Sequence, residues 1–264
     1  MHLSTALSRI APSQTTAMTD RATQLREEGR DVISLSVGEP DFATPDHVVA
    51  AAKAALDAGQ TKYTPVGGTS RLKQTVSAGG KQAIFHAMLA TVSEGDEVIV
   101  PAPWWVSYPE IIHFAGGKVI PLYTHAKDNF RFTGADLEAQ IGPRTQWLML
   151  NSPGNPTGAC YPREMLQGLA EVLRRHPRVM VLSDDIYAPI NYTGAPHATL
   201  ASLCPDLAER ILTVSGVSKS HAMTGFRIGV SAGPEWLIKA MERLQSHSSG
   251  NPCSISQAAA VAAF

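Results

Sequence analysis

The residues best suited to chemistry lie in the segment 214–229, which reads Val-Ser-Gly-Val-Ser-Lys-Ser-His-Ala-Met-Thr-Gly-Phe-Arg-Ile-Gly. Lys219 and Arg227 stand eight residues apart among small side chains. A lysine in a partly dry pocket loses some preference for its charged form, and the free amine can condense with an aldehyde. An arginine offers a planar, permanently charged fork for a phosphate. A ligand that carries both an aldehyde and a phosphate would be pyridoxal 5′-phosphate. The alternative is that Lys219 and Arg227 are ordinary solvated loop residues.

The elements that must position this segment alternate between strand and helix. Helical patterns occupy residues 45–56, 82–92, 163–175, 235–245 and 254–264. Short aliphatic runs predict strands at residues 32–37, 97–100, 118–122, 147–150, 179–182, 211–214 and 228–231. Alternation of this kind predicts an α/β fold with a mainly parallel sheet and helices on both faces. Lys219 falls between two strands, and ligands of such sheets bind beyond the carboxyl ends of the strands.

Three further polar residues follow predicted strands and would converge on one ligand. Asn155 lies after the strand at 147–150, where its amide can donate to a phenolate oxygen. Asp184 lies directly after the strand at 179–182, where a carboxylate can keep a pyridine nitrogen protonated. Tyr187 can share the phenolate oxygen. Taken singly, these residues also fit an Asn-Pro turn, a helix cap or a metal ligand.

Two other segments suit the phosphate and the ring of such a ligand. Gly79, Gly80 and Lys81 open a predicted helix, whose backbone amides and dipole favour an anion. Trp105 belongs to an aromatic cluster after the strand at 97–100 and can stack on a heteroaromatic ring. A plain turn and core packing are the alternative interpretations of these two segments.

Composition restricts the classes of function. The chain has 264 residues, of which 44% are hydrophobic, enough for a large core. Lys and Arg total 22 against 23 Asp and Glu, so no net charge attracts nucleic acid or a membrane. Cys160, Cys204 and Cys253 lack metal-ligand spacing, which predicts reduced thiols, no metal site and a cytoplasmic setting. The first residues lack the pattern of a secretory signal, and no apolar run is long enough to span a bilayer.

Taken in order, the motifs resemble the class I and II aminotransferases among the fold type I pyridoxal-phosphate enzymes. The similarity is greatest to the bacterial aspartate aminotransferases and extends from Leu7 to Phe264. The motifs that carry it are Gly38-Glu-Pro-Asp-Phe-Ala-Thr-Pro45, Lys62-Tyr63-Thr-Pro, Gly79-Gly-Lys-Gln-Ala, Pro103-Trp-Trp-Val-Ser-Tyr-Pro, Asn151-Ser-Pro-Gly-Asn-Pro-Thr-Gly, Ser183-Asp-Asp-Ile-Tyr187 and Ser218-Lys-Ser-His-Ala-Met-Thr-Gly-Phe-Arg-Ile-Gly.

The resemblance implies a role for each site residue. Lys219 would carry the cofactor and shuttle a proton, and Asp184 would pair with the pyridine nitrogen. Trp105 would stack on the ring, and Tyr63 would reach the cofactor phosphate of the neighbouring subunit of a homodimer. Gly38, Trp105 and Asn155 would contact the substrate. The remaining cofactor contacts would be Asn155 and Tyr187 to the phenolate oxygen, and Gly80, Lys81, Ser218 and Arg227 to the phosphate.

The chain departs from the family pattern at two places. The resemblance implies an N-terminal arm over residues 1–33 and a cofactor-binding large domain over 34–264. Between Thr69 and Gly79 the family has a helix, a connection and a strand, whereas here the connection is shortened near 70–78 and a sheet strand is expected to be missing. The chain also ends at Phe264, before the family's C-terminal small domain with its carboxylate-binding arginine.

The expected function is transfer of an amino group between an L-amino acid, aspartate-type or related, and a 2-oxo acid. A pyridoxal-phosphate lyase on the same fold is an alternative, because both reactions begin at the same lysine. An inactive remnant is the other alternative, favoured by the two departures. Ala11 stands where many aspartate-type relatives have lysine, which weakens the case for acidic substrates.

Overall fold

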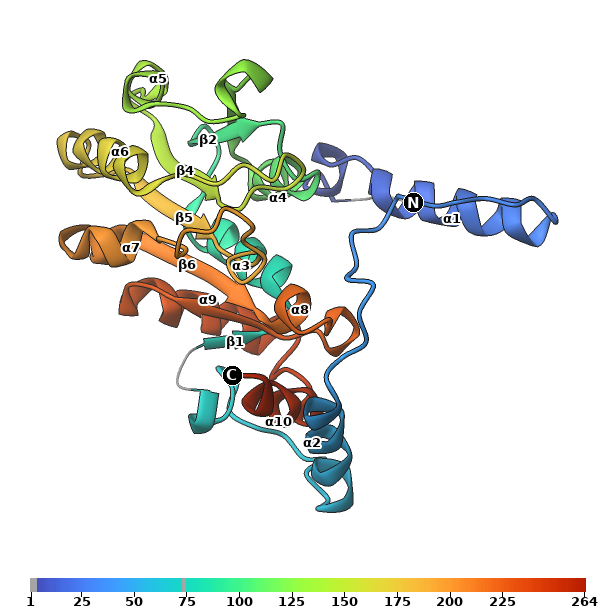
Figure 1. The fold of residues 1–264 in the computed structure, drawn as a ribbon. Helices are drawn as coiled ribbons and strands as arrows, with labels where there is room; N and C mark the ends of the chain where they lie inside the picture. The colour runs from blue at the N-terminus through green and yellow to red at the C-terminus, as the bar shows by residue number, and fades with distance from the viewer. Residues whose placement is uncertain (1–3, 73–74) are drawn as a thin grey trace.

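A seven-stranded sheet forms the centre of the fold in the computed structural model, which describes residues 4–72 and 75–264. The strand order is β1-β7-β6-β5-β4-β2-β3 (Figure 1). The strands are β1 (Thr75–Ser77), β2 (Glu97–Ala102), β3 (Lys118–Tyr123), β4 (Thr145–Asn151), β5 (Met180–Asp184), β6 (Ile211–Gly216) and β7 (Gly229–Ala232). The predicted α/β fold is confirmed.

The pairing is parallel from β3 to β6 and antiparallel at the other end. Strand β7 runs antiparallel to β6, pairing Gly216 with Gly229, and β1 runs antiparallel to β7, pairing Val76 with Val230. The expected loss of a strand near residues 70–78 is therefore wrong. Three residues of the short connection suffice to occupy the sheet edge, because β7 presents them with an unpaired backbone ladder.

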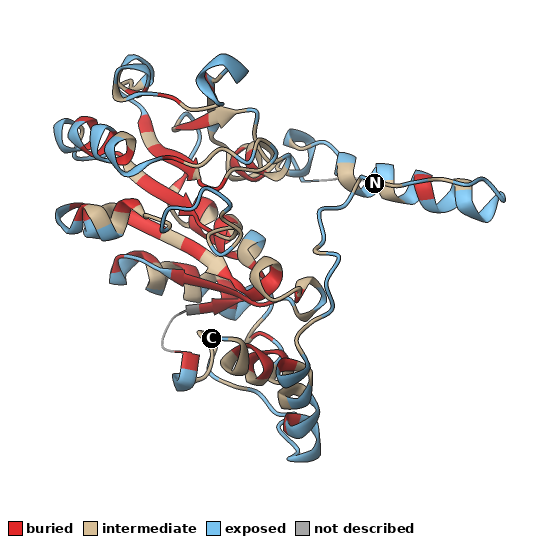
Figure 2. Ribbon diagram, viewed as in Figure 1, coloured by how far each residue is buried: buried red, intermediate tan, exposed pale blue. Residues whose placement is uncertain are grey.

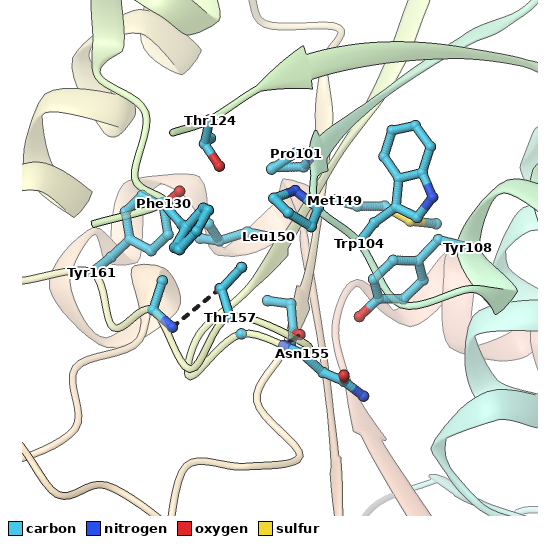
Figure 3. A pocket seen from close by; sticks show the side chains of 14 residues that line it. Pro101, Trp104, Tyr108, Thr124, Phe130, Met149, Leu150, Asn155, Thr157 and Tyr161 are labelled. Atoms are coloured by element: carbon cyan, nitrogen blue, oxygen red, sulfur yellow. Dashed lines mark hydrogen bonds between the residues drawn. The ribbon is translucent and has the colours of Figure 1, made fainter. Parts of the chain in front are cut away.

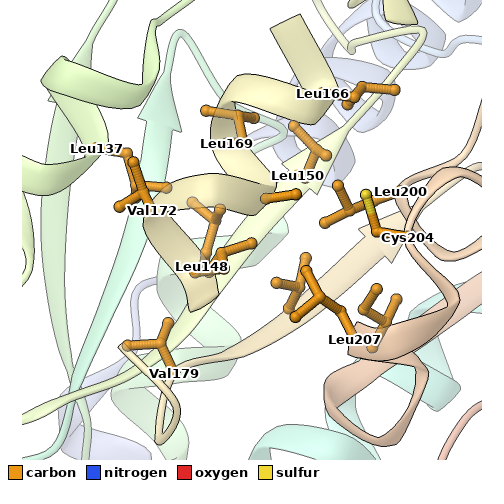
Figure 4. Packing of buried hydrophobic residues seen from close by; sticks show 14 of the residues in the cluster. Leu137, Leu148, Leu150, Leu166, Leu169, Val172, Val179, Leu200, Cys204 and Leu207 are labelled. Carbon is orange, nitrogen blue, oxygen red and sulfur yellow. The ribbon is translucent and has the colours of Figure 1, made fainter. Parts of the chain in front are cut away.

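Helices cover one face of the sheet through a cluster built on β4 and β5. Leu148 and Leu150 point to this face and meet the apolar stripe of α6, where Leu166 and Leu169 are buried. Figure 4 shows α6 lying across these strands with its leucines turned toward them. The helices of this face are α5 (Gly134–Gln140), α6 (Arg163–Arg175) and α7 (Leu200–Leu203). Successive side chains of a strand point to opposite faces of the sheet, so a single strand contributes residues to the apolar clusters on both faces.

The opposite face carries a second cluster, which includes the alternate residues of β4. Trp147 and Met149 pack there, and the Trp147 indole donates a hydrogen bond of 2.9 Å to Thr91 Oγ1. The helices of this face are α3 (Gly80–Thr91), α4 (Ser107–Ala115) and α9 (Glu235–Ser248). Helix α3 begins directly after β1, so its N-terminus lies at the edge where the parallel strands end.

Two helices close the lower end of the molecule as drawn in Figure 1. They are α2 (Asp46–Asp57) and α10 (Ser254–Ala263), which pack in a third cluster around Val48, Ala259 and Ala260. Short turns complete the chain: α8 (Val217–Ser220), and the 3-10 helices η1 (Leu7–Arg9), η2 (Ser70–Leu72), η3 (Ala126–Asp128), η4 (Pro205–Arg210) and η5 (Thr224–Phe226).

The N-terminal arm extends away from this body. Its helix α1 (Gln14–Glu27) is capped by Ser13 and almost wholly exposed, as Figures 1 and 2 show, with Ala22 its buried residue. The strand predicted at residues 32–37 does not form. This segment is extended, but Ile33 and Leu35 are 87% and 93% exposed and pair with no strand of the described chain. An alternating pattern becomes a strand only when a neighbour accepts its hydrogen bonds.

Candidate functional site

A cavity of about 410 Å³ lies beyond the carboxyl ends of the parallel strands. The sequence-predicted residues of this chain gather there from six separate segments, with the N-terminal arm supplying Thr15 as well. Those lining the cavity are Gly38, Gly80, Lys81, Trp105, Asn155, Asp184, Tyr187, Ser218, Lys219 and Arg227. The predicted residues therefore meet at the edge of the sheet where ligands of parallel sheets bind.

Lys219 lies on α8, in the connection between β6 and β7. Its amine donates a hydrogen bond to the Gly38 carbonyl oxygen and lies 5.9 Å from the centroid of the Tyr187 ring. Burial lowers the pKa of Lys219; the Glu39 carboxylate opposes this effect and the Arg227 charge adds to it. Because its pKa is lowered, a larger fraction of this half-buried amine is uncharged and can act as a nucleophile or a base.

Arg227 and the start of α3 form a cradle with room for an anion. Arg227 has a left-handed backbone, with φ of 56°, and its guanidinium donates to the carbonyls of Thr224 at 2.8 Å and Ala78 at 3.3 Å. A Cβ at Gly79 would overlap this guanidinium, and one at Gly229 would overlap the Gly79–Gly80 peptide. Glycine at position 79 therefore lets the Arg227 guanidinium approach the helix N-terminus, and glycine at position 229 lets β7 lie against it.

Asp184 ends β5 and is buried, and it has a partner that the sequence interpretation missed. Tyr108 donates a hydrogen bond of 2.6 Å to Asp184 Oδ2, and Ile186 N donates to Asp184 Oδ1 at 3.3 Å. Burial raises the pKa of Asp184 to about 6, although the Tyr108 hydrogen bond acts in the opposite direction. Burial and the neighbouring Asp184 charge raise the pKa of Tyr108 well above its usual value, so it remains the donor.

The loop after β4 presents Asn155 through a short relay. Asn151 donates to the Asp184 carbonyl at 2.7 Å, and its own side-chain oxygen accepts from Asn155 N, also at 2.7 Å. The Asn155 amide then donates to the Tyr187 hydroxyl at 3.2 Å. Figure 3 shows Asn155 and Tyr108 turning their polar ends to the same side of the strand ends. An amide and a phenol held together in this way can bind one oxygen of a ligand.

Trp105 covers another side of the cavity. Tyr108 meets it edge to face, with ring centroids 5.3 Å apart at 86°. The Lys81 ammonium lies 4.9 Å from the centre of the same indole, a favourable cation–π distance. Burial, and then the Arg227 charge, lower the pKa of Lys81. Lys81 therefore brings a side-chain charge into the cavity, in addition to the backbone amide predicted from the sequence.

Tyr63 is the predicted site residue that this chain does not bring to the cavity. Its side chain is 98% exposed and lies near the groove between α2 and α10. This placement agrees with the expectation that Tyr63 would serve a neighbouring subunit, but does not test it.

Two general findings concern the chain between residues 4 and 264, apart from 73 and 74. This part holds no group of three or more His, Cys, Asp or Glu side chains arranged to bind a metal ion. It also holds no helix long and apolar enough to cross a membrane.

Comparison with known proteins identifies the family. The model of the aminotransferase class I and II family matches residues 74–264. The chain belongs to the class I and II aminotransferases. The aspartate/prephenate aminotransferase of Cereibacter sphaeroides is 49% identical over 281 aligned positions, covering 99% of this chain and 70% of the relative. The aspartate aminotransferase of Rhizobium meliloti is 47% identical, covering 98% and 68%. Both relatives are transaminases by name, in agreement with the predicted enzyme class.

Solved aminotransferase structures show the same fold. The crystal structure of the aspartate aminotransferase from Rhizobium meliloti has a TM-score of 0.95 and 45% identity, covering all of this chain and 70% of that one. The Thermus thermophilus aspartate aminotransferase with maleate also has a TM-score of 0.95, with 40% identity, and 72% of its chain is covered. The 281 aligned positions exceed the 264 residues of the chain by 17, so the Cereibacter relative carries at least 17 residues with no counterpart here.

Proposed function

We propose that this chain is a pyridoxal 5′-phosphate-dependent aminotransferase that exchanges an amino group between an aspartate-type L-amino acid and a 2-oxo acid. The observation that carries the proposal is the joint presence of Lys219 and Asp184 in one cavity. Family membership supports the reaction class, since the relatives are aminotransferases of aspartate by name. The same proposal assigns residues 1–33 to an N-terminal arm and residues 34–264 to the cofactor-binding large domain.

The residues present fit this cofactor. The cradle of Gly79, Gly80 and Arg227 offers cationic and backbone donors in a place that a side chain at Gly79 would fill. Ser218 lines the same cavity and can add a hydroxyl donor to the phosphate. Trp105 would stack on the ring. The Asn155–Tyr187 pair would bind the phenolate oxygen, and Asp184 would face the pyridine nitrogen.

Each residue has a separate task in the reaction. When bound, the cofactor supplies an aldehyde and a protonated ring that draws electrons from the α-carbon of the amino acid. The Lys219 amine, with its lowered pKa, would take the α-proton and return it. Asp184 would keep the ring nitrogen protonated, which requires its carboxylate form, and Tyr108 supports that form by donating to it. Trp105 and Tyr187 would limit the access of water.

The substrate class is supported by charge as well as by the relatives. One structural neighbour was solved with maleate, a dicarboxylate. In this chain the Lys81 ammonium faces the cavity over Trp105 and is not needed for the phosphate, which Arg227 can hold. Lys81 would therefore bind the distal carboxylate of an acidic substrate. Lys81 would thus supply a positive charge for acidic substrates although position 11 has alanine in place of lysine.

A homodimer would complete the site. Tyr63, Leu35 and Ile33 are all more than 85% exposed although their side chains are large and mostly apolar. Such groups are typical of protein interfaces rather than of solvated surface. In the proposed dimer Tyr63 would donate its hydroxyl to the phosphate in the partner's cavity.

The test combines cofactor trapping with product analysis. The chain is incubated with pyridoxal 5′-phosphate, reduced with borohydride and mapped by peptide mass spectrometry, and we expect the adduct on Lys219. Lys219→Ala should lose it, whereas Lys239→Ala, which removes an exposed lysine paired with Glu235, should keep it. An unchanged adduct in Lys219→Ala contradicts the cofactor assignment.

Turnover then separates the aminotransferase from its alternatives. With L-aspartate as donor, an aminotransferase stops after one equivalent of product unless a 2-oxo acid such as prephenate is supplied. A lyase on the same fold would turn over without an acceptor. A remnant would form the Lys219 adduct and give no product under either condition. Either of the last two results overturns the proposed reaction and leaves the cofactor assignment intact.

A further inference from the structure

A second cavity, of about 550 Å³, is lined in part by Ser152, Cys160 and Tyr161 of the loop that follows β4. It is bounded by the N-terminus of α6 and by residues 191–198, and it shares no lining residue with the proposed cofactor cavity. Its volume falls within the range of small-molecule sites. The cavity lies on the face of the sheet that α6 covers, where the apolar cluster drawn in Figure 4 is packed.

Arg131 is the unusual feature of this cavity. Its guanidinium lines the wall, its Nε is buried without a hydrogen-bond partner, and no carboxylate in the described part of the chain comes within ion-pair distance. A guanidinium is a planar, positively charged group with several N–H donors. A partly buried positive charge without a counter-ion is costly, and an anion in the cavity would remove that cost.

The surrounding groups favour the same kind of ligand. His197 lines the cavity, and its Nε2 lies 3.7 Å from Asp185 Oδ1 without a hydrogen bond to any described residue. Arg163 opens α6, a helix of 13 residues whose first turn has no side-chain cap. Asn191 also lines the cavity; its amide donates to the Ala195 carbonyl at 2.9 Å and has a second N–H for a ligand. Against these groups the lining has one acidic side chain, that of Glu164, which is exposed.

We propose that this cavity is a second binding site, for a small organic molecule that carries a carboxylate or a phosphate. Arg131 would hold the anionic group through its planar fork, as arginine does for both oxyanions. His197, Asn191 and Thr193 would contact the remainder of the molecule. The proposal is independent of the reaction assigned to the first cavity, because no residue is common to the two.

Three cysteines provide a direct test. Cys160 lines the second cavity, Cys253 is exposed elsewhere and Cys204 is buried in the core. The full chain is loaded with pyridoxal 5′-phosphate, freed of the excess by gel filtration, alkylated with iodoacetamide and followed by peptide mass spectrometry. Inorganic phosphate and succinate are added in separate series, with succinamide as the neutral control. At ten times its dissociation constant, a bound anion should slow alkylation of Cys160 about tenfold and leave Cys253 unchanged.

Variants then assign the effect to Arg131. Arg131→Gln should weaken the protective anion at least about tenfold, and Arg131→Lys should fall between, because it keeps the charge without the fork. Arg144→Gln, which removes an exposed arginine paired with Glu97, should behave as the parent chain. Cys204 reports unfolding, since its alkylation would accelerate in any variant that loses the core. Equal protection in Arg131→Gln, or no protection of Cys160 by either anion, overturns the proposal.

Discussion

At the scale of single residues, the proposed chemistry depends on groups held in unusual protonation environments. Burial lowers the pKa of Lys219 and raises that of Asp184. The types and positions of both residues were predictable, because each follows a strand. Tyr108 was not assigned a role, since its partner Asp184 is 76 residues away and only the folded sheet brings them together. Contacts across a sheet have no local pattern in the sequence.

Replacing Tyr108 tests its role as the residue that positions Asp184. Tyr108→Phe keeps the edge contact with Trp105 but removes the hydroxyl that donates to the carboxylate, so the pKa of Asp184 should rise further above 6. The measurement is the affinity for pyridoxal 5′-phosphate as a function of pH. Its acidic midpoint should move up by roughly half a unit to one unit relative to the parent chain. Tyr161→Phe, another buried tyrosine, should leave the midpoint in place.

The raised pKa of Asp184 also predicts how the stability of the cofactor-free chain depends on pH. The pKa of this carboxyl is about 6 in the folded chain and ordinarily 3.8, so the folded state binds the proton more tightly. The free energy of unfolding should therefore fall as pH rises from 3.8 to 6, by on the order of 3 kcal/mol from this group. Asp184→Asn should remove that fall, as judged by urea unfolding at several pH values.

The control has the opposite sign. The pKa of Asp206 is lowered by its hydrogen bond to Arg174, so its contribution is present at neutral pH and is lost on acidification. Asp206→Asn should therefore cost stability at neutral pH and not at low pH. A difference between Asp184→Asn and the parent chain that stays constant with pH would contradict the burial argument.

At the scale of elements, the sequence predicted the helices and strands that bury a continuous apolar face. It did not predict where a strand forms only because a neighbouring strand accepts its hydrogen bonds. The α6 helix matches its predicted bounds, since its apolar stripe is strong. Strand β1 was missed because three residues carry too little periodicity, and residues 32–37 were predicted as a strand that found no partner.

The junction between β7 and the start of α3 makes the sharpest prediction at this scale. A methyl group at Gly229 would overlap the backbone of Gly79 and Gly80, which cannot move aside as a side chain can. Gly229→Ala should therefore destabilise the chain by several kcal/mol, in the range of overpacked cores, and weaken cofactor binding through the displaced cradle. Gly168→Ala is the matched control. Gly168 lies inside α6 with open space around it, so alanine should stabilise by roughly 0.5–1 kcal/mol. Thermal unfolding of the two variants distinguishes these outcomes.

At the scale of the whole molecule, the proposed dimer explains features that one chain leaves without purpose. The arm extends from the body (Figures 1 and 2). The large side chains of Ile33, Leu35 and Tyr63 are exposed. Exposure of this kind was not predictable from the sequence, because alternating apolar residues indicate burial without saying against what. Leu35→Glu should weaken self-association measured by sedimentation, whereas Tyr192→Ser, an equally exposed residue outside this segment, should not change it.

Subunit mixing tests whether the partner completes the site. In the proposed dimer each cavity combines Lys219 of one subunit with Tyr63 of the other, so Lys219→Ala and Tyr63→Phe damage different halves of a site. A heterodimer of the two variants then holds one cavity with both original residues and one with neither. After unfolding and refolding an equal mixture, about a quarter of all cavities should regain the parent affinity for pyridoxal 5′-phosphate, by random pairing of subunits around a two-fold axis. If Tyr63 acted within its own chain, every cavity in the mixture would keep one defect. Affinity equal to the average of the separate variants would therefore exclude the shared site.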